Sequence, residues 1–336
     1  MPEKPLLSEV HGFVGQDLQR PECVIWHPSE LLIIPNWYGN GGVSLISGDQ
    51  RTHHLLSNGP EPLRPNGIAL ENGGTVLLAH MGETRGSIYR LFADGNTEPV
   101  VTTVNSEPMP PANFVVVDSD NRLWITVSTR KTPRASDYRA NANSGFIAVA
   151  EPGATDAHIV ADNLGYTNEC VIDEARGYVY VNETFGRRLT RFDLSRGNPA
   201  VLSKPTVIAH FGDGTYPDGL TLDSEGCLWV TSIVSNRIIR VYPDGKQEVF
   251  FEDSVDAHLQ NVEKAYESDS LGREHLDNAQ SRQMKNISNA AFGGPSGQRL
   301  FLGNLLGTTI PFLDVEATGA PMVHWEASLG ALQQFV

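Results

Sequence analysis

Six acidic or amide side chains recur along the chain, each just before an apolar run that a turn joins to a second apolar run. They are Glu22, Asn66, Asn113, Asn168, Asp218 and Asn289, at intervals of 44 to 71 residues. Carboxylate and amide oxygens suit a hard cation such as Ca²⁺, which accepts about six to eight oxygen ligands. No histidine holds one of these places, so a zinc site of three histidines is not expected.

Asparagine and aspartate also favour turns, where their side chains bond the nearby backbone. For a single residue this explanation is simpler than a ligand, and it stays open for Asn66 and Asn289. It does not account for Glu22, nor for the repetition of the pattern at a regular period. We therefore expect the six side chains to converge on one site.

The segments that position these side chains have the pattern of short β-strands. In the unit that Asp218 opens, the apolar runs are Leu220–Leu222, Leu228–Val230, Arg237–Val241 and Gln247–Phe250. Four short strands at a period of about 40 to 50 residues are typical of a propeller blade. Six copies predict an all-β fold, a six-bladed β-propeller with four-stranded blades in a single domain over residues 1–336.

The blades are expected at about residues 22–63, 64–110, 111–165, 166–215, 216–286 and 287–336, with an N-terminal strand added to the last. Helical periodicity at Ser254–Lys285 predicts a short helical insertion in blade five. Leu7–Val14 or Met322–Trp325 could supply the outer strand of blade six, and we favour the N-terminal segment. Trp124 and Trp229, in second strands, are expected to pack between blades.

Composition excludes several classes of partner. The chain has 25 Lys and Arg against 40 Asp and Glu, a net charge of −15, which disfavours nucleic acids and anionic membranes. It has no apolar run of the length that a transmembrane helix needs, and Met1–Gln16 has no apolar stretch typical of a signal peptide. Three cysteines without a Cys-x-x-Cys motif fit a reducing compartment, so we expect a cytoplasmic protein that acts on a small molecule. The sequence does not indicate the oligomeric state.

The repeated pattern resembles the senescence marker protein, gluconolactonase and luciferin-regenerating enzyme family of calcium-dependent six-bladed propellers. The resemblance runs from about Glu22 to Trp325, and its most specific segments are Tyr216–Val230, Pro65–Leu70 and Phe292–Gly303. It implies a lactonase with one divalent metal ion, Ca²⁺ before Zn²⁺ or Mn²⁺. The metal ligands that it implies are Glu22, Asn113, Asn168 and Asp218, of which Asp218 would also be the catalytic acid and base.

The chain departs from this family at three places. Pro111 and Phe114 stand where sugar-lactone members commonly have an arginine and an aspartate around the third-blade asparagine. Glu169 replaces the usual glycine after the fourth-blade asparagine, and Cys23-Val24 replaces the usual Gly-Pro after Glu22. We expect a substrate less polar than a sugar lactone.

The predicted mechanism is hydrolysis of a lactone or related ester. The metal would polarise the carbonyl, and Asp218 would activate the attacking water. A bound cation would also lower the pKa of Asp218 and weaken it as a base, so Glu169 or Glu183 is a candidate for assistance.

Loops on the same face as the metal ligands should form the substrate pocket. They contain Trp37-Tyr38, His80-Met81, Ser128-Thr129-Arg130, Glu183-Thr184 and Asn304-Leu305. The expected substrate-binding residues are Trp37, Tyr38, Asn66, His80, Phe114, Arg130, Glu183 and Asn289. Ordinary loop packing is an alternative for the aromatic residues and for His80. Arg130 and Arg134 could clamp a carboxylate, although solvated loop arginines are the simpler interpretation.

Two other functions remain open at this point. The protein could be a non-catalytic propeller that binds a ligand and keeps calcium only for structure. It could also be a metal-dependent isomerase or lyase on the same scaffold, because a fold does not fix the chemistry.

Overall fold

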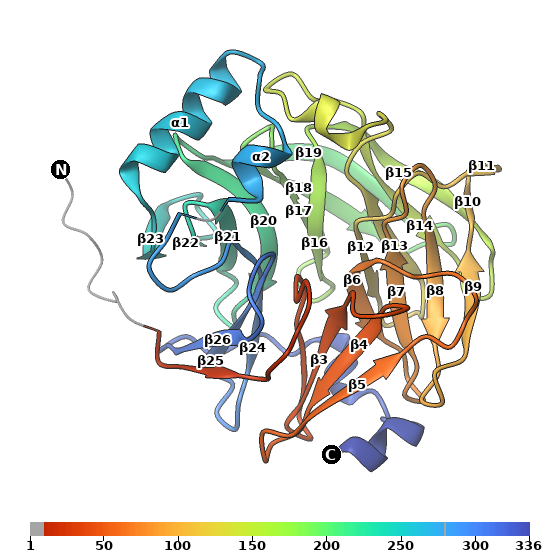
Figure 1. The fold of residues 1–336 in the computed structure, drawn as a ribbon. Coiled ribbons are helices and arrows are strands. Elements are labelled where there is room, and N and C mark those ends of the chain that lie inside the picture. The colour runs from red at the N-terminus through yellow and green to blue at the C-terminus, as the bar shows by residue number, and fades with distance from the viewer. Residues whose placement is uncertain (1–9, 279) are drawn as a thin grey trace.

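The computed structural model describes residues 10–278 and 280–336 of the chain. The strands of these residues form six sheets arranged around a ring (Figure 1). In blades one, two, four and five the strands follow chain order from the inside outward, because short hairpins join antiparallel neighbours. The inner strands of blades three and six follow the same order, and strands from elsewhere in the chain are added at their outer edges. The predicted six-bladed β-propeller is confirmed.

The first three blades contain the following strands. Blade one has β2 (Ile25–His27), β3 (Leu31–Asn36), β4 (Gly42–Ile46) and β5 (Thr52–Leu56). Blade two has β6 (Pro65–Leu70), β7 (Val76–His80), β8 (Ser87–Leu91) and β9 (Thr97–Val101). Blade three has β12 (Phe114–Val117), β13 (Leu123–Val127), β14 (Gly145–Ala150) and β15 (Asp156–Leu164).

The other three blades follow the same order. Blade four has β16 (Thr167–Asp173), β17 (Tyr178–Glu183), β18 (Arg188–Ser195) and β19 (Val201–His210). Blade five has β20 (Thr215–Leu222), β21 (Leu228–Val234), β22 (Arg237–Val241) and β23 (Gln247–Glu252). Blade six has β24 (Ile287–Gly293), β25 (Arg299–Asn304), β26 (Ile310–Asp314) and β1 (Gly12–Val14).

Blade three differs from the predicted four-stranded pattern. The hairpin of β10 (Thr103–Val104) and β11 (Glu107–Pro108) extends its outer edge, where β10 pairs in parallel with β15. We expected residues 103–108 in blade two, which precedes them in the chain. They join blade three because β15 has nine residues and leaves backbone groups at its edge for a further strand.

The N-terminal segment closes the ring. Strand β1 pairs with β26, with Gly12 opposite Phe312 and Val14 opposite Ile310. This confirms the favoured choice for the outer strand of blade six, although residues 7–9 of the predicted segment lie outside the described residues. The alternative, Met322–Trp325, is not a strand, because Val323–Glu326 forms the 3₁₀ helix η2.

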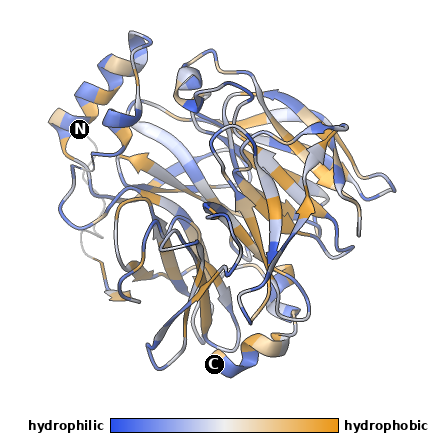
Figure 2. Ribbon diagram, turned by 45° about the vertical axis from the view of Figure 1, so that its right-hand side comes forward, coloured by the Kyte–Doolittle hydropathy of each residue, from blue (hydrophilic) through white to orange (hydrophobic). Residues whose placement is uncertain are grey.

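Many apolar residues lie in the strands, which are partly orange in Figure 2. Their buried side chains form clusters that join neighbouring blades. Both tryptophans pack as predicted. Trp124 belongs to a cluster with Cys170 and Val179 of blade four, and Trp229 packs against Phe292 of blade six. The three cysteines are buried and form no disulfide. Among the described residues, no helix is both long and apolar enough to cross a membrane.

Helical segments cover one end of the propeller (Figure 1). They are α1 (Asp256–Glu267), α2 (Arg273–Leu276) and the 3₁₀ helix η1 (Arg134–Asp137). The two α-helices are the insertion predicted in blade five. In α1, His258, Val262 and Ala265 are buried, and their spacing places them on one face of the helix. The C-terminal 3₁₀ helix η3 (Gly330–Phe335) lies at the other end.

Candidate functional site

β-Bulges occur in the inner strands near several of the recurring acid and amide residues. The pairing register shifts between Pro65 and Ile68 in β6, between Thr167 and Cys170 in β16, and between Pro217 and Leu220 in β20. These intervals contain Asn66, Asn168 and Asp218. A bulge leaves an extra residue unpaired and re-aims its side chain, which explains why polar residues are tolerated in buried inner strands.

Five of the six recurring residues line one pocket at the helix-covered end of the ring. The pocket has a volume of about 430 Å³, and the five are Glu22, Asn66, Asn113, Asn168 and Asp218. All five side chains are buried. All four residues expected to bind the metal are therefore in the same cavity, although they come from four different blades.

The amides form a chain of hydrogen bonds around the pocket floor. Asn66 Nδ2 donates to Asn113 Oδ1 at 3.2 Å, and Asn113 Nδ2 donates to Asn168 Oδ1 at 2.7 Å. Asn168 Nδ2 donates to Thr184 Oγ1 at 3.0 Å. The buried Asn66 Oδ1 has no hydrogen-bond partner in the described part of the chain. The floor therefore presents amide oxygens that are fixed in place by their neighbours.

The backbone of Asp218 is fixed by Asn182, a residue that is not identified from the sequence. Asn182 Nδ2 donates to the backbone oxygens of Asp218 at 3.1 Å and of Gly219 at 2.9 Å. Asn182 is fully buried at the end of β17. Its one sequence signal is a polar residue directly after the apolar run Tyr178–Val181, which by itself does not indicate its partner.

The site holds two buried carboxylates, Glu22 and Asp218, that act on each other electrostatically. Burial raises the pKa of Asp218 well above its usual value, and the charges of Glu22 and Glu169 raise it further. Arg20, which donates to Glu22 Oε2 at 2.9 Å, opposes this effect only in part. Two buried carboxylates beside fixed amide oxygens are a donor set that a hard divalent cation would neutralise, so the residues fit the expected metal.

Glu169 and Asn289 lie apart from this pocket, deeper in the central channel. They line a smaller cavity of about 70 Å³ together with Cys23 and Phe114. Asn289 Nδ2 donates to both Glu169 oxygens, at 2.8 and 2.9 Å, and Leu220 N donates to Oε2 at 3.0 Å. Burial raises the pKa of Glu169 to about 8, to which the charge of Glu22 also contributes. Glu169 thus neighbours the four expected ligands from the channel side.

Other expected pocket residues are engaged elsewhere. The ring centroid of Trp37 lies 5.2 Å from the guanidinium carbon of Arg20 and 5.8 Å from that of Arg64, and Tyr38 is 60% exposed. His80 Nδ1 accepts from Arg64 N at 2.9 Å, and burial lowers the pKa of this histidine.

Two charged candidates are held in ion pairs. Arg130 pairs with Asp162 at 2.8 Å, and Glu183 accepts from Arg188 and Thr190. The alternation of side chains along a strand explains part of these differences. Met81 and Thr184, each one residue beyond an expected position, line the pocket instead of His80 and Glu183, and Leu305 lines it as well.

The pocket wall is formed mainly by the long loop of blade three and by the caps of blades four and five. Its side chains include Arg134, Tyr138, Tyr166, Phe185, Ile233 and Leu276. Tyr138 stacks on Phe185 at 4.5 Å between ring centroids, and Tyr166 contacts Phe185 edge-on at 4.7 Å. The wall is therefore aromatic, but its aromatic residues are not those that the sequence predicted.

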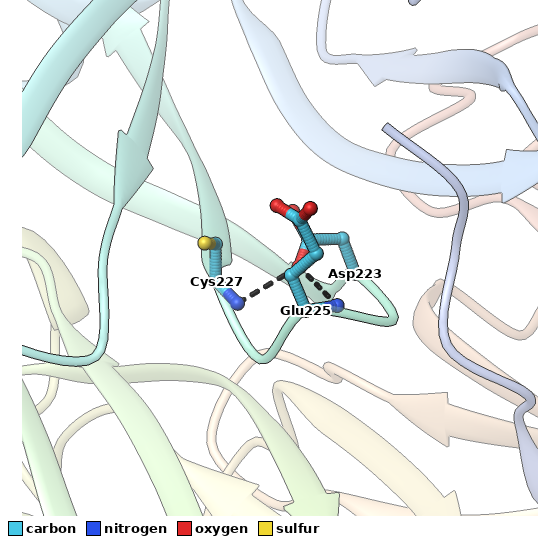
Figure 3. Close-up of side chains that lie close together, drawn as sticks. All are labelled: Asp223, Glu225 and Cys227. Atoms are coloured by element: carbon cyan, nitrogen blue, oxygen red, sulfur yellow. Dashed lines mark hydrogen bonds between the residues drawn. The ribbon is translucent and has the colours of Figure 1, made fainter. Parts of the chain in front are cut away.

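A second cluster of potential metal ligands lies beyond the opposite end of β20 (Figure 3). Oxygen and sulfur atoms of Asp223, Glu225 and Cys227 lie within 4.8 Å of one another. Asp223 Oδ1 accepts from the backbone of Glu225 at 3.0 Å and of Cys227 at 2.8 Å, and Oδ2 accepts from Trp229 Nε1 at 3.0 Å. Arg240 pairs with both carboxylates, at 2.7 and 2.6 Å.

Blade three repeats this turn. Asp118 accepts from the backbone of Asp120 and Arg122 and from Trp124 Nε1. The guanidinium of Arg122 pairs with Asp118 and Asp120, both at 2.7 Å. Because the same bonds recur in two blades, the Asp223 cluster is explained as a hairpin turn neutralised by an arginine.

Comparisons with known proteins agree with this geometry. The family model described as SMP-30/gluconolactonase/LRE-like region matches residues 21–251. The 6-deoxy-6-sulfogluconolactonase of Pseudomonas putida is 26% identical over 239 residues, which cover 67% of this chain and 76% of that protein. Pentonolactonase XacC of Haloferax volcanii is 21% identical over 332 residues, 92% of this chain and 95% of that protein.

Among solved structures, the calcium-binding protein regucalcin from Agrobacterium tumefaciens superposes with a TM-score of 0.66. The two are 17% identical, and the match covers 93% of this chain and 96% of that one. At this identity the likeness shows the shared fold.

Proposed function

The chain belongs to the SMP-30/gluconolactonase/LRE-like family of lactonase-type hydrolases, and from this premise we propose that it is a metal-dependent hydrolase that opens a lactone ring. The observation that supports this most is the meeting of Glu22, Asn113, Asn168 and Asp218 in one buried pocket. We propose that these four residues hold one divalent cation, Ca²⁺ in the first place.

When bound there, such a cation supplies polarisation of a carbonyl and compensation of negative charge on its oxygen. Asp218 orients the attacking water and accepts its proton at a carboxylate oxygen, then returns that proton to the alkoxide of the opened ring. The backbone of Asp218 is fixed by Asn182, so its carboxylate needs little rearrangement during the reaction. Glu169, whose pKa burial raises to about 8, assists from the channel side as a second proton acceptor beside Asp218.

The pocket wall favours a substrate with fewer hydroxyl groups than a sugar lactone. Tyr138, Tyr166 and Phe185 offer ring faces and edges, and Ile233, Leu276 and Leu305 add aliphatic surface. Hydroxyl groups that contact such surfaces would lose hydrogen bonds to water without replacement. The wall does not include Trp37, Tyr38 or Phe114, the aromatic residues that the sequence predicts there.

The test combines metal analysis with a substrate panel. Purified protein is assayed for bound metal and then for hydrolysis of alkyl, aryl and sugar lactones, with and without EDTA. We expect about one divalent ion per chain, and a loss of activity of at least about 100-fold on chelation that Ca²⁺ restores. The alkyl and aryl lactones should have the higher kcat/KM.

Variants identify the site. Glu22→Gln should lose the metal, whereas Glu61→Gln, at an exposed position outside the pocket, should retain it. Hydrolysis that is indifferent to chelation would contradict the metal-dependent mechanism. A metal-loaded protein without any hydrolysis would instead support a ligand-binding propeller.

A further inference from the structure

Three arginines line the candidate pocket, and two of them are neutralised by carboxylates. Arg20 bonds to Glu22 at 2.9 Å, and Arg273 bonds to both oxygens of Asp277 at 3.0 Å. The third is Arg134, the first residue of η1. Its position in the long loop between β13 and β14 brings it over the pocket from blade three.

Arg134 bonds only to neutral oxygens among the described residues. Its Nη2 donates to Asn113 Oδ1 at 3.1 Å and to Ser128 Oγ at 3.0 Å, and its Nε donates to Tyr166 Oη at 3.3 Å. Its Nη1 is buried and has no hydrogen-bond partner in residues 10–278 and 280–336. One face of a permanently charged guanidinium is therefore left without an acceptor.

The loop that carries Arg134 is anchored, so the arginine is held in place. Asp137, which is fully buried in η1, accepts from Thr129 Oγ1 and Ser144 Oγ, both at 2.7 Å, and pairs with Lys131 at 2.6 Å. Thr129 and Ser144 stand at the two ends of the loop. This anchoring reduces the freedom of Arg134 to turn outward to solvent.

Arg134 is half-buried, and no carboxylate bonds to it among the described residues, although Glu22 acts on it electrostatically. Its buried Nη1 without an acceptor carries a desolvation cost, and this cost falls when an anion binds there. The guanidinium offers paired N–H groups that match the oxygens of a carboxylate or sulfonate. Tyr138 and Phe185 flank the same cavity and would exclude water around such a pair. A substrate with an anionic group and few hydroxyl groups would satisfy both features of the wall.

We propose that Arg134 binds an anionic substituent, a carboxylate or sulfonate, that the lactone substrate carries in addition to its ring. This inference rests on the proposed function, because it names the substrate class of the same pocket. Arg134 is then a specificity residue, and hydrolysis of such a lactone gives a product with two negative charges, the substituent and the new carboxylate.

The kinetic test uses two lactones that differ in one charge. One is a γ-butyrolactone that carries a carboxymethyl group, and the other carries the uncharged carbamoylmethyl group of similar size. Wild-type protein should prefer the acid, and Arg134→Gln should reduce this preference in kcat/KM at least about tenfold. Arg51→Gln is the control, because Arg51 is 65% exposed and its one ion pair within the described part of the chain is with Asp49.

A binding test separates this inference from the hydrolase proposal. Benzenesulfonate is titrated into calcium-loaded protein by calorimetry, and Arg134→Gln should weaken its Kd at least about tenfold while Arg51→Gln does not. The Kd of Arg134→Lys, which retains the charge, should lie between those of the wild type and Arg134→Gln. Melting temperatures confirm that each variant is folded.

The outcomes distinguish the two proposals. If no lactone is hydrolysed but benzenesulfonate binding depends on Arg134, the anion site stands and the hydrolase proposal fails. If Arg134→Gln lowers kcat/KM equally for both lactones, or leaves both the preference and the sulfonate affinity unchanged, the anion site is overturned.

Discussion

Asp218 shows how burial and neighbouring charge prepare one residue for two roles. Its pKa is raised by burial and by the charges of Glu22 and Glu169. Without a metal, Asp218 therefore favours its protonated form, whereas a bound cation would favour the carboxylate. Asp218→Asn retains an oxygen for the metal but removes the base. We expect kcat to fall at least about 100-fold while Ca²⁺ affinity, measured by calorimetry, falls much less.

The control for this variant is Asp213→Asn, which removes a carboxylate from a side chain that is 91% exposed. It should leave kcat and Ca²⁺ affinity close to the wild-type values. Full kcat in calcium-loaded Asp218→Asn would exclude Asp218 as the base and would direct attention to Glu169, the next carboxylate along the channel.

His324, far from the metal ligands along the chain, should make stability depend on pH. Burial lowers its pKa to about 4, and the charge of His27 also disfavours protonation. The unfolded chain takes up this proton near its usual pKa of about 6.5, so stability is lost as the pH falls from about 6.5 to about 4. The loss should be about 1 to 2 kcal/mol, measured by urea unfolding across this range.

His324→Gln removes the titrating group and should flatten this part of the pH profile. The quantity to compare is the slope of stability against pH in wild type and variant. The absolute stabilities are not compared, because the substitution also changes packing near Trp26. An unchanged slope would show that other groups cause the acid sensitivity.

At the scale of elements, the bulge in β20 requires a glycine after Asp218. A Cβ on Gly219 would lie 2.4 Å from Asn289 Cα and 2.5 Å from Ser288 O, in the backbone of β24. Backbone atoms cannot yield as a side chain end can, so Gly219→Ala should push β20 away from β24 and displace Asp218. We expect a destabilisation of about 1 to 3 kcal/mol and a Ca²⁺ affinity at least about tenfold weaker.

Gly212→Ala is the matched control in the loop before β20, because a Cβ there meets no heavy atom within 4 Å. It should change stability by no more than about 0.5 kcal/mol. Equal metal affinity in the two alanine variants would show that the close packing of β20 on β24 does not position the ligand.

The repeated pattern allowed the blades and the five pocket residues to be predicted, because each blade repeats an acid or amide residue, an apolar run, a turn and a second apolar run. The bulges were not predicted, since the register depends on pairing between strands that a single strand does not encode. For the same reason His80 and Glu183 were expected in the pocket, where the next residues, Met81 and Thr184, are found.

At the scale of the molecule, contacts between distant loops decide the wall of the pocket. Arg134 and Tyr138 come from blade three, Phe185 from blade four and Leu276 from the insertion of blade five. Sequence periodicity identifies the insertion as helical but gives no information on which loops it covers. The aromatic wall and the half-buried Arg134 therefore became visible only in the three-dimensional arrangement.

The C-terminal segment closes the opposite end of the ring. Ser328 bonds to Asn72 and Gly73, both at 2.9 Å, next to the turn that follows β6. Leu329 and Leu332 then enter the apolar core between blades one and two, where Leu332 is fully buried. This contact ties the end of the chain to blades that form near its beginning.

Leu332→Ala tests whether this contact stabilises the whole ring. The substitution leaves a cavity between blades one and two, so we expect it to lower the free energy of unfolding by about 3 kcal/mol in urea. Leu306→Ala, at a position that is 36% exposed, should cost less than about 1 kcal/mol. Since propeller blades support one another around the ring, a large loss in a single transition would show that the C-terminal segment belongs to the same cooperative unit. A small loss, or an early separate transition, would show that it docks on a ring that is already stable without it.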